Sequence, residues 1–209
     1  MKEKFSLINL DVSRETIDNL NVYVDILRKW NATINLVSKG SITDVWKRHI
    51  LDSAQLFKFV THDMEKWLDI GSGAGFPGLV IAILAKGRFT NLQVTLIESD
   101  KRKCVFLNEV VRELDLNVKI LSKRIEDCPP HDADVISARA LTQLENLLFY
   151  FTFHGSSNCK GLFLKGKNAK NELSLFCVSN NLLVKLTQSE VDKSSYLIEV
   201  GKKESYCEK

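Results

Sequence analysis

The sequence predicts an α/β fold in which helices cover both faces of a mostly parallel sheet with an antiparallel edge. Strand-like and helix-like segments alternate from residue 67 onward, a pattern typical of parallel sheets. A glycine-rich turn, DIGSGAGFPG, joins the first strand to a helix. The 209 residues are enough for one full hydrophobic core. We therefore expect ligands to bind at the carboxyl ends of the strands.

The segment before the first strand is predicted to be helical. Apolar residues recur at helical spacing over residues 14–30, and Ser13 is a suitable N-cap. Ser41 and Asp44 have capping-box spacing and predict one further helix before the glycine-rich turn. These two helices form an N-terminal helical extension.

The remaining elements follow in order along the chain. The pattern predicts strand 67–70, helix 77–86, strand 93–98, helix 101–114, strands 118–122 and 134–138, helix 142–152, strand 161–165, helix 168–178, and strands 182–187 and 195–200. The last two strands are expected to form the antiparallel edge. We accordingly divide the chain into an extension of residues 1–62 and a sheet-containing domain of residues 63–209.

The glycine-rich turn indicates a site where a ligand approaches the backbone closely. Free backbone N–H groups and the positive end of a helix dipole suit a phosphate, a carboxylate or the polar part of a nucleotide-like cofactor. A dinucleotide fingerprint would need its third glycine where Phe76 stands. Asp69 followed by Gly71, Gly73 and Gly75 instead resembles the first motif of the S-adenosylmethionine-dependent methyltransferases. A glycine-rich turn without a ligand is the remaining alternative.

An acidic residue ends the next predicted strand. Glu98 follows the glycines by roughly 20–30 residues, a position from which a carboxylate accepts hydrogen bonds from ribose hydroxyls. Dinucleotide enzymes use an acid at this place too. Glu98 therefore indicates a nucleoside cofactor without choosing between the two classes.

Seven separate stretches carry a more specific likeness. They are KWNATINLVS, RHILDS, LDIGSGAGFPGLVIAI, LIESDKRKCVFL, SKRIEDC, SARAL and LKGK. In this order, over about residues 20–200, the chain resembles the bacterial 16S ribosomal RNA guanine-N7 methyltransferases, also called glucose-inhibited division protein B. The resemblance implies a Rossmann-like class I methyltransferase domain with S-adenosyl-L-methionine as methyl donor. The methyl acceptor it implies is N7 of one guanine in the decoding-region loop of 16S ribosomal RNA in the small ribosomal subunit.

The same motifs imply a set of cofactor-binding residues. The glycine turn gives the loop, Ile125 and Glu126 of SKRIEDC match the pair that meets the adenine, and Arg139 of SARAL matches an arginine at the cofactor site. The predicted cofactor-binding residues are Asp69, Gly71, Gly73, Gly75, Phe76, Glu98, Ile125, Glu126 and Arg139. A packing role for Phe76 is the alternative.

The predicted reaction requires no catalytic side chain. Guanine N7 has an exposed lone pair and no proton to lose, so alignment with an activated methyl group can supply the catalysis. His49 and Asp52 lie on one predicted helical face and are candidates for the substrate site. The structural alternative is that Arg48 pairs with Asp52 while His49 lies at the edge of the core.

Contact with RNA is expected from local basic residues, because the formal net charge is only +3. Lys101, Arg124 and Lys165 each follow a predicted strand end, so we expect them on the edge of the sheet that holds the cofactor. They complete the candidate substrate-site residues. The other basic residues are as readily explained by simple solvation.

Composition and cysteine spacing set the remaining expectations. The five cysteines are widely spaced without a C-x-x-C pair, and the histidines show no metal-ligand spacing. We expect a cytoplasmic monomer that binds 16S ribosomal RNA or a small-subunit particle, without a metal ion or a membrane. Two alternative functions stay open at this point: a dinucleotide-dependent oxidoreductase, and a noncatalytic RNA-binding or assembly factor with the same fold.

Overall fold

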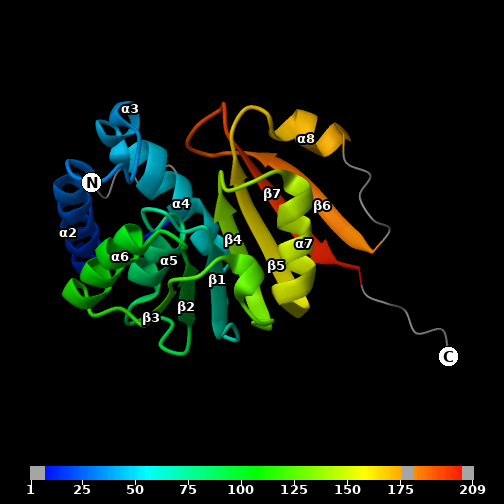
Figure 1. Cartoon of the computed structure of the whole chain (residues 1–209), viewed down its shortest axis with the longest axis horizontal. Helices are drawn as coiled ribbons and strands as arrows, with labels where there is room; N and C mark the ends of the chain where they lie inside the picture. The colour runs from blue at the N-terminus through cyan, green and yellow to red at the C-terminus, as the bar shows by residue number, and fades with distance from the viewer. Residues whose placement is uncertain (1–7, 176–180, 204–209) are drawn as a thin grey trace.

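The computed structural model describes residues 8–175 and 181–203, which form a seven-stranded sheet between two layers of helices (Figure 1). The strands are β1 (Lys66–Ile70), β2 (Gln93–Ile97), β3 (Val118–Leu121), β4 (Ala133–Arg139), β5 (Gly155–Lys165), β6 (Leu182–Gln188) and β7 (Tyr196–Lys202). Their spatial order is β3-β2-β1-β4-β5-β7-β6. The first five are parallel, and β7 pairs antiparallel with both β5 and β6. The predicted mostly parallel sheet with an antiparallel edge is confirmed.

The principal helices lie where the periodicity predicts them. They are α2 (Arg14–Asn31), α5 (Gly78–Ala85), α6 (Lys101–Glu113), α7 (Leu144–His154) and α8 (Ala169–Leu175). Ser13 caps α2, because its hydroxyl accepts a hydrogen bond of 3.0 Å from the backbone N–H of Thr16. The predicted continuation of α8 to residue 178 lies outside the described residues. Strand β5 begins directly after α7, six residues earlier than the sequence predicts, at Gly155 rather than 161.

The further N-terminal helix is present as an irregular helical run over residues 45–59, and its predicted start at Ser41 is wrong. The chain instead forms α3 (Lys39–Ile42), the π-helical turn η1 (Trp46–Leu51), α4 (Asp52–Ala54) and the 3₁₀ turn η2 (Gln55–Phe59). Ser41 lies inside α3 and does not cap a helix, because its hydroxyl donates to the carbonyl of Ser38 at 3.0 Å. The capping-box spacing of Ser41 and Asp44 was therefore coincidental.

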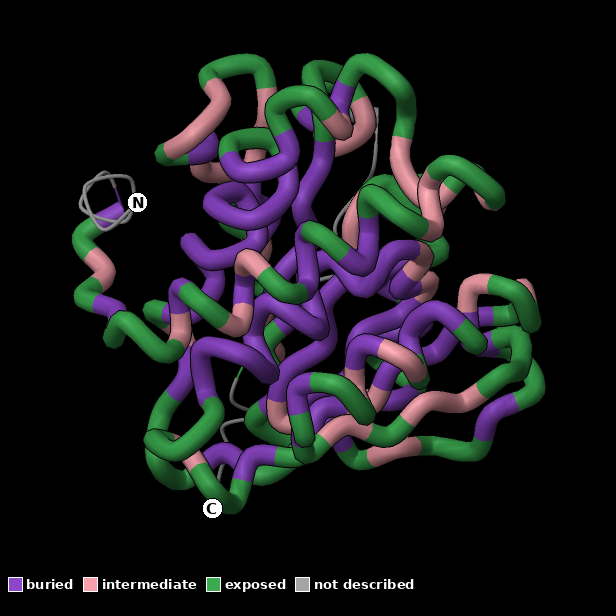
Figure 2. The backbone as a smooth tube through the Cα atoms, turned by 90° about the vertical axis from the view of Figure 1, so that its left-hand side faces the viewer, coloured by how far each residue is buried: buried purple, intermediate pink, exposed green. Residues whose placement is uncertain are grey.

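Alternate side chains of each central strand enter opposite apolar layers. Trp67 of β1 packs with α2, α5 and α6 on one face, whereas the neighbouring Leu68 packs with α7 on the other. Figure 2 shows the buried backbone running through the middle of the molecule. Residues of the N-terminal helical segments belong to the same apolar cluster as α5 and α6. The division of the chain at residue 62 stays a prediction.

A chain of buried hydrogen bonds joins β1 to β4 beneath the glycine-rich turn. The indole N–H of Trp67 donates to the hydroxyl of Ser137 at 2.8 Å, and that hydroxyl donates to Oδ1 of Asp69 at 2.6 Å. Asp69 is fully buried, and burial raises its pKa to about 6 despite the hydrogen bond from Ser137. A carboxyl group is thus part of the interior of the sheet.

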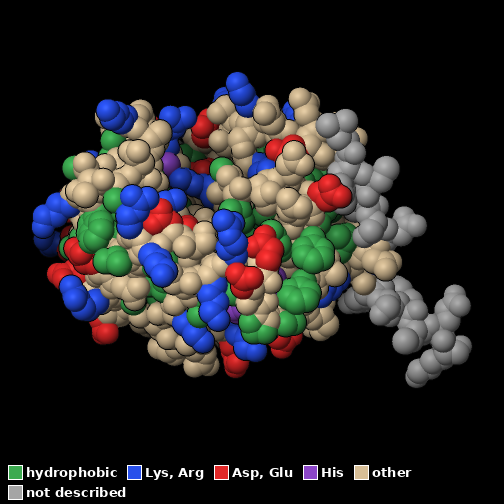
Figure 3. All heavy atoms as spheres, viewed as in Figure 1, with side chains coloured by type: hydrophobic (Ala, Val, Ile, Leu, Met, Phe, Trp, Pro, Cys, Tyr) green, Lys and Arg blue, Asp and Glu red, His purple; other side chains and the backbone are tan. Residues whose placement is uncertain are grey.

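The molecular surface carries both signs of charge. On the face drawn in Figure 3, Lys and Arg side chains are interspersed with Asp and Glu. Over the described ranges 8–175 and 181–203, none of the helices has the length and apolar character needed to cross a membrane.

The raised pKa of Asp69 predicts a pH dependence of stability. Below about pH 4 the carboxyl of Asp69 is protonated in both the folded and the unfolded protein. Between about pH 4 and 6 it ionises in the unfolded protein but stays protonated in the folded protein, so the free energy of unfolding falls as the pH rises. Asp69→Asn removes this loss. Denaturant titrations at pH 4.5 and 7.5 should show the variant gaining about 1–3 kcal/mol relative to the wild type over that interval. If the difference in free energy of unfolding between the two proteins is the same at both pH values, the pKa of Asp69 is not raised.

Candidate functional site

The glycine-rich turn after β1 is a tight loop held against the end of β2. Gly71, Gly73 and Gly75 have positive φ angles of 66°, 57° and 89°, conformations that glycine adopts without strain. The backbone N–H of Gly71 donates to the carbonyl of Ile97 at 2.9 Å. The sequence therefore folds here into a loop that exposes backbone rather than side chains.

Space as well as conformation demands these glycines. A Cβ at Gly71 would lie 2.2 Å from Leu141, and one at Gly75 would lie 2.4 Å from Leu79. A Cβ at Gly73 would meet nothing closer than 3.9 Å. The open space at Gly73 belongs to a cavity above the loop.

This cavity, which we call the glycine-loop cavity, has a volume of about 490 Å³ and lies at the carboxyl ends of β1 to β4. Its volume is in the range of small-ligand and cofactor sites. Its lining residues are Gly71, Gly73, Ile97, Glu98, Ser99, Lys103, Lys123, Arg124, Ile125, Glu126, Arg139, Ala140, Leu141, Thr142, Asn146 and Tyr150.

Most of the predicted cofactor residues converge on the glycine-loop cavity. Those that line it are Gly71, Gly73, Glu98, Ile125, Glu126 and Arg139. They come from the ends of four neighbouring parallel strands, which explains why residues distant in sequence meet here. Their binding roles stay predictions.

Three predicted cofactor residues do not line the cavity, and their binding roles stay predictions. Asp69 is buried beneath the loop, where it is bonded to Ser137, and a Cβ at Gly75 would point inward onto Leu79. Phe76 is only 3 % exposed and packs into the core, so the packing alternative for this residue is the one the structure shows. An acid or an aromatic ring inside a glycine motif can face inward, and the spacing alone does not reveal the direction.

Glu98 fixes the loop from the end of β2. Its Oε2 accepts from the backbone N–H of Gly73 at 2.8 Å, and its Oε1 accepts from the backbone N–H of Asp100 at 2.8 Å. The side chain is 8 % exposed and lines the cavity. Since each carboxylate oxygen has two lone pairs, these bonds leave acceptor capacity for ligand hydroxyls.

Several lining residues escaped the sequence reasoning. Leu141 and Thr142 follow β4, and the strand-end rule that predicted Glu98 after β2 extends to them. Tyr150 comes from α7 and donates a hydrogen bond to Glu126. No local pattern marks Tyr150, because it reaches the cavity only through the packing of α7 against the sheet.

A second cavity adjoins the first. This His49 cavity has a volume of about 350 Å³, and it shares Arg139 and Ala140 with the glycine-loop cavity. Its lining residues are Leu36, Val37, Ser38, Ser41, Arg48, His49, Asp52, Arg139, Ala140, Leu164, Lys165, Gly166, Asp192 and Ser195. The helical segments before β1, the ends of β4 and β5, and the loop between β6 and β7 all contribute to its wall.

His49 is buried in the π-helical turn η1 with its ring stacked on Phe76. The ring centroids are 4.9 Å apart and the planes are inclined by 18°. Burial, followed by the charges of Arg139 and Arg48, lowers the pKa of His49 to about 3. The imidazole is therefore neutral at physiological pH, and neither ring nitrogen has a hydrogen-bond partner among the described residues.

Arg139 stands between the two cavities. Its guanidinium carbon lies 4.9 Å from the centroid of the Phe76 ring, a cation–π contact, and its Nη1 donates to the carbonyl of Arg48 at 3.2 Å. Burial lowers its pKa, while Asp52 acts in the opposite direction. One aromatic ring thus orients both Arg139 and His49.

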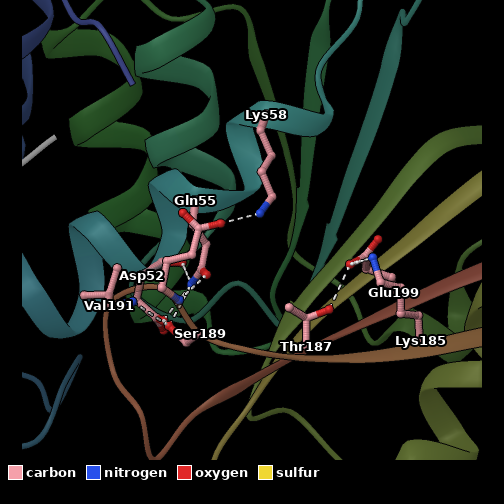
Figure 4. Close-up of polar contacts among 9 residues, drawn as sticks. Asp52, Gln55, Lys58, Lys185, Thr187, Ser189, Val191 and Glu199 are labelled. Atoms are coloured by element: carbon pink, nitrogen blue, oxygen red, sulfur yellow. Dashed lines mark hydrogen bonds and ion pairs between the residues drawn. The ribbon is translucent and has the colours of Figure 1, made fainter. Parts of the chain in front are cut away.

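Asp52 belongs to a polar network between the helical segments and the β6–β7 loop (Figure 4). Its Oδ1 accepts from the Ser189 hydroxyl at 3.0 Å and from Nε2 of Gln55 at 2.9 Å. Burial raises its pKa above the usual range. Over the part of the chain that the structure describes, Arg48 forms no ion pair with Asp52, so the alternative pairing expected from the sequence is absent.

Tyr23 holds the glycine loop from the N-terminal side and was missed by the sequence reasoning. Its hydroxyl donates to the carbonyl of Ala74, and its ring centroid lies 5.4 Å from that of Phe76. The residue is fully buried in α2. Its helical spacing marks it as a core residue, but nothing in the sequence marks its hydrogen bond to a loop 51 residues away.

The three basic residues predicted on the cofactor edge of the sheet differ in their surroundings. Lys101 and Arg124 are exposed, and Arg124 lines the glycine-loop cavity. The ammonium of Lys165 is buried, donates to the carbonyl of Thr142 at 2.6 Å and pairs with Glu172 at 2.7 Å. The charge of Lys165 is thus balanced by Glu172 of α8. The residue lines the His49 cavity and remains a substrate-site candidate.

Comparison with solved structures confirms the fold class. A SAM-dependent methyltransferase from Aquifex aeolicus has a TM-score of 0.61 at 15% identity, covering 78% of this chain and 98% of that one. A methyltransferase from Geobacter sulfurreducens has a TM-score of 0.61 at 11% identity, covering 93% and 92% of the two chains. At such low identity these structures show a shared fold alone.

Comparison with protein families and with curated relatives identifies the family as well as the fold. The family model described as GidB, rRNA small subunit methyltransferase G, matches residues 16–198. A "Ribosomal RNA small subunit methyltransferase G" from Jannaschia sp. (strain CCS1) is 47% identical over 187 residues, 90% of this chain and 89% of the relative. One of the same name from Ruegeria sp. (strain TM1040) is 49% identical over 166 residues, 79% and 80% of the two chains. The chain therefore belongs to the rRNA small subunit methyltransferase G family.

Proposed function

We propose that this protein transfers a methyl group from S-adenosyl-L-methionine to N7 of one guanine in 16S ribosomal RNA of the small ribosomal subunit. One observation carries the proposal: a cavity with the features of a nucleoside-cofactor site adjoins a second, polar cavity through Arg139 and Ala140. Donor and acceptor sites of a transfer reaction must meet in this way. Membership of the family supports the same reaction class.

The residues of the glycine-loop cavity fit the proposed methyl donor. Gly73 leaves backbone exposed for the amino acid part, Glu98 has free acceptor capacity for ribose hydroxyls, and Ile125 with Glu126 lies one strand further for the adenine. When bound, the sulfonium supplies an activated methyl group. The chain's own residues have to hold it in line with the acceptor and exclude water.

Two alternative functions differ from this proposal in what they predict. A dinucleotide oxidoreductase is disfavoured because the chain belongs to a methyltransferase family and Phe76, buried in the core, occupies the place of the third dinucleotide glycine. A noncatalytic assembly factor would keep cofactor affinity without transfer. The finer expectations of a cytoplasmic monomer without a metal ion stay predictions.

The test of the function is a methyl-transfer assay. The protein is incubated with methyl-labelled S-adenosyl-L-methionine and small subunits purified from cells that lack this modification. We expect label in 16S ribosomal RNA at one guanine, where N7 methylation permits chemical strand cleavage. Cofactor binding without label transfer would favour the assembly factor, and binding of a nicotinamide or flavin instead would favour the oxidoreductase.

A first prediction concerns the open space at Gly73. Gly73 and Gly87 both have positive φ and no close neighbour for a Cβ, but only Gly73 lines the cavity. Replacing either one by Ala should cost about 1–2 kcal/mol of stability through backbone strain. Calorimetry should show weaker S-adenosyl-L-methionine binding by Gly73→Ala alone. Equal affinities in the two variants would remove the glycine loop from the cofactor site.

A second prediction concerns pH. Because the pKa of His49 is lowered to about 3, its protonation state does not change in the neutral range. Single-turnover methylation with saturating RNA and cofactor should be nearly flat from about pH 6.5 to 8.5. His49→Ala should reduce the rate without changing this shape. An acidic limb in the wild type that disappears in His49→Ala would instead identify His49 as a general base.

A third prediction separates the exposed Arg124 from the buried Lys165. Arg124→Ala should reduce the salt dependence of RNA binding by up to about one unit of log–log slope and leave stability unchanged. Lys165→Ala removes the buried partner of the half-buried Glu172 and should lower the free energy of unfolding by about 1–2 kcal/mol. Filter binding at several salt concentrations and denaturant titration check the pair. An unchanged salt slope in Arg124→Ala would mark a solvated charge.

A further inference from the structure

The His49 cavity contains polar groups whose hydrogen-bonding capacity the protein does not use. Both ring nitrogens of His49 are buried without partners, and the residue is only 7% exposed. Oδ1 of Asp52 is occupied by Gln55 and Ser189, whereas Oδ2 receives no donor from the described residues. A buried polar group left without a partner is costly, so the two ring nitrogens of His49 indicate a ligand, and Oδ2 of Asp52 is a free acceptor in the wall of the same cavity.

The hydrogen-bonding groups of His49 and Asp52 also define which edge of a nucleic-acid base can bind them. A neutral imidazole offers one N–H donor and one acceptor nitrogen, whereas a carboxylate offers acceptors only. The Watson–Crick edge of guanine carries one acceptor, O6, beside two donors, N1–H and the N2 amino group. Adenine presents the amino group where guanine has O6 and an acceptor at N1. A carboxylate facing the N1 position therefore matches guanine and opposes adenine, and the imidazole matches O6 in the tautomer that presents its N–H.

We propose that Asp52 and His49 read the Watson–Crick edge of the target guanine. Asp52 accepts from N1–H and the N2 amino group, and the N–H of His49 donates to O6. This inference deepens the proposed function and rests on it. The Watson–Crick edge lies across the base from N7, so a guanine held in this way leaves N7 free for the wall that Arg139 and Ala140 share with the glycine-loop cavity.

The surrounding contacts keep the two reading groups fixed. Gln55 and Ser189 hold one oxygen of Asp52, and the stack on Phe76 holds the plane of His49. Such preorganisation is needed because an enzyme that acts on a base reads it after taking it out of its stack. Figure 4 shows Asp52, Gln55 and Ser189 converging from the helical segments and the β6–β7 loop.

The experiment compares guanine with inosine at the methylated position. Inosine keeps N7, O6 and N1–H but lacks the N2 amino group. Small subunits are reconstituted with RNA that carries either base, and kcat/KM for methylation is measured. The wild type should prefer guanine by about 5- to 150-fold, the effect of leaving one buried acceptor unpaired.

Asp52→Asn tests which residue makes this distinction. The Asn side chain keeps the oxygen that Ser189 and Gln55 bind, so its NH₂ group takes the position of Oδ2 and opposes the guanine donors. Methylation of guanine should fall about 10- to 100-fold, and the preference over inosine should shrink towards one. S-adenosyl-L-methionine affinity should stay unchanged.

Ser189→Ala is the matched control, because it weakens the same network but keeps the carboxylate. Its guanine-to-inosine ratio should remain that of the wild type even if its rate and melting temperature fall. Equal turnover of guanine and inosine by the wild type overturns the inference whether or not Asp52→Asn folds. So does a wild-type ratio in a folded Asp52→Asn. Failure of the wild type to methylate any small subunit would overturn the proposed function instead.

Discussion

The buried carboxyl group of Asp69 is the constraint on which the site depends. It is bonded to Ser137 of β4, and its own backbone carbonyl accepts from the hydroxyl of Ser72 at 3.0 Å. A Cβ at Gly78 would lie 2.9 Å from the Cβ of Asp69, so α5 can begin here only with glycine. One side chain thereby sets the spacing of β1 and β4, the path of the loop and the start of the helix. Burial opposes the ionisation of Asp69, so the residue lowers stability at neutral pH while it holds the loop in place.

The parallel sheet then determines which residues meet. Carboxyl ends of neighbouring strands lie along one edge, so Gly71, Glu98, Ile125 and Arg139 converge although they span much of the sequence. Phe76 adds the link between the two cavities, since His49 stacks on its ring and Arg139 lies over it. Phe76 itself lines neither cavity, but its ring contacts one residue of the His49 cavity and one residue that lines both.

Periodicity and strand-end rules predicted most of this arrangement, and their failures have physical causes. The strands, α2, α5, α6 and α7 follow from apolar spacing, and the residues after β1, β2 and β3 follow from their place at strand ends. The irregular start of the helical segment before β1 was missed because capping-box spacing does not show that the Ser41 hydroxyl bonds the carbonyl of Ser38, three residues earlier, instead of capping a helix. The ion pair of Lys165 was not predicted because its partner Glu172 belongs to a helix that meets it only in three dimensions. Tyr23 and Tyr150 were missed for the same reason.

The second cavity also shows why the helical segments before β1 are needed. The residues that line the glycine-loop cavity all follow β1 in the chain, but His49 and Asp52 of the His49 cavity come from residues before the sheet. Their far wall, Asp192 and Ser195, comes from the β6–β7 loop near the other end of the chain. Hydrogen bonds from Ser189 to Asp52, and an ion pair between Lys58 and Glu190, close the two parts around one space. The helical segments before β1 and the remainder of the described chain therefore both contribute to the wall of the His49 cavity, and neither part can form that cavity alone.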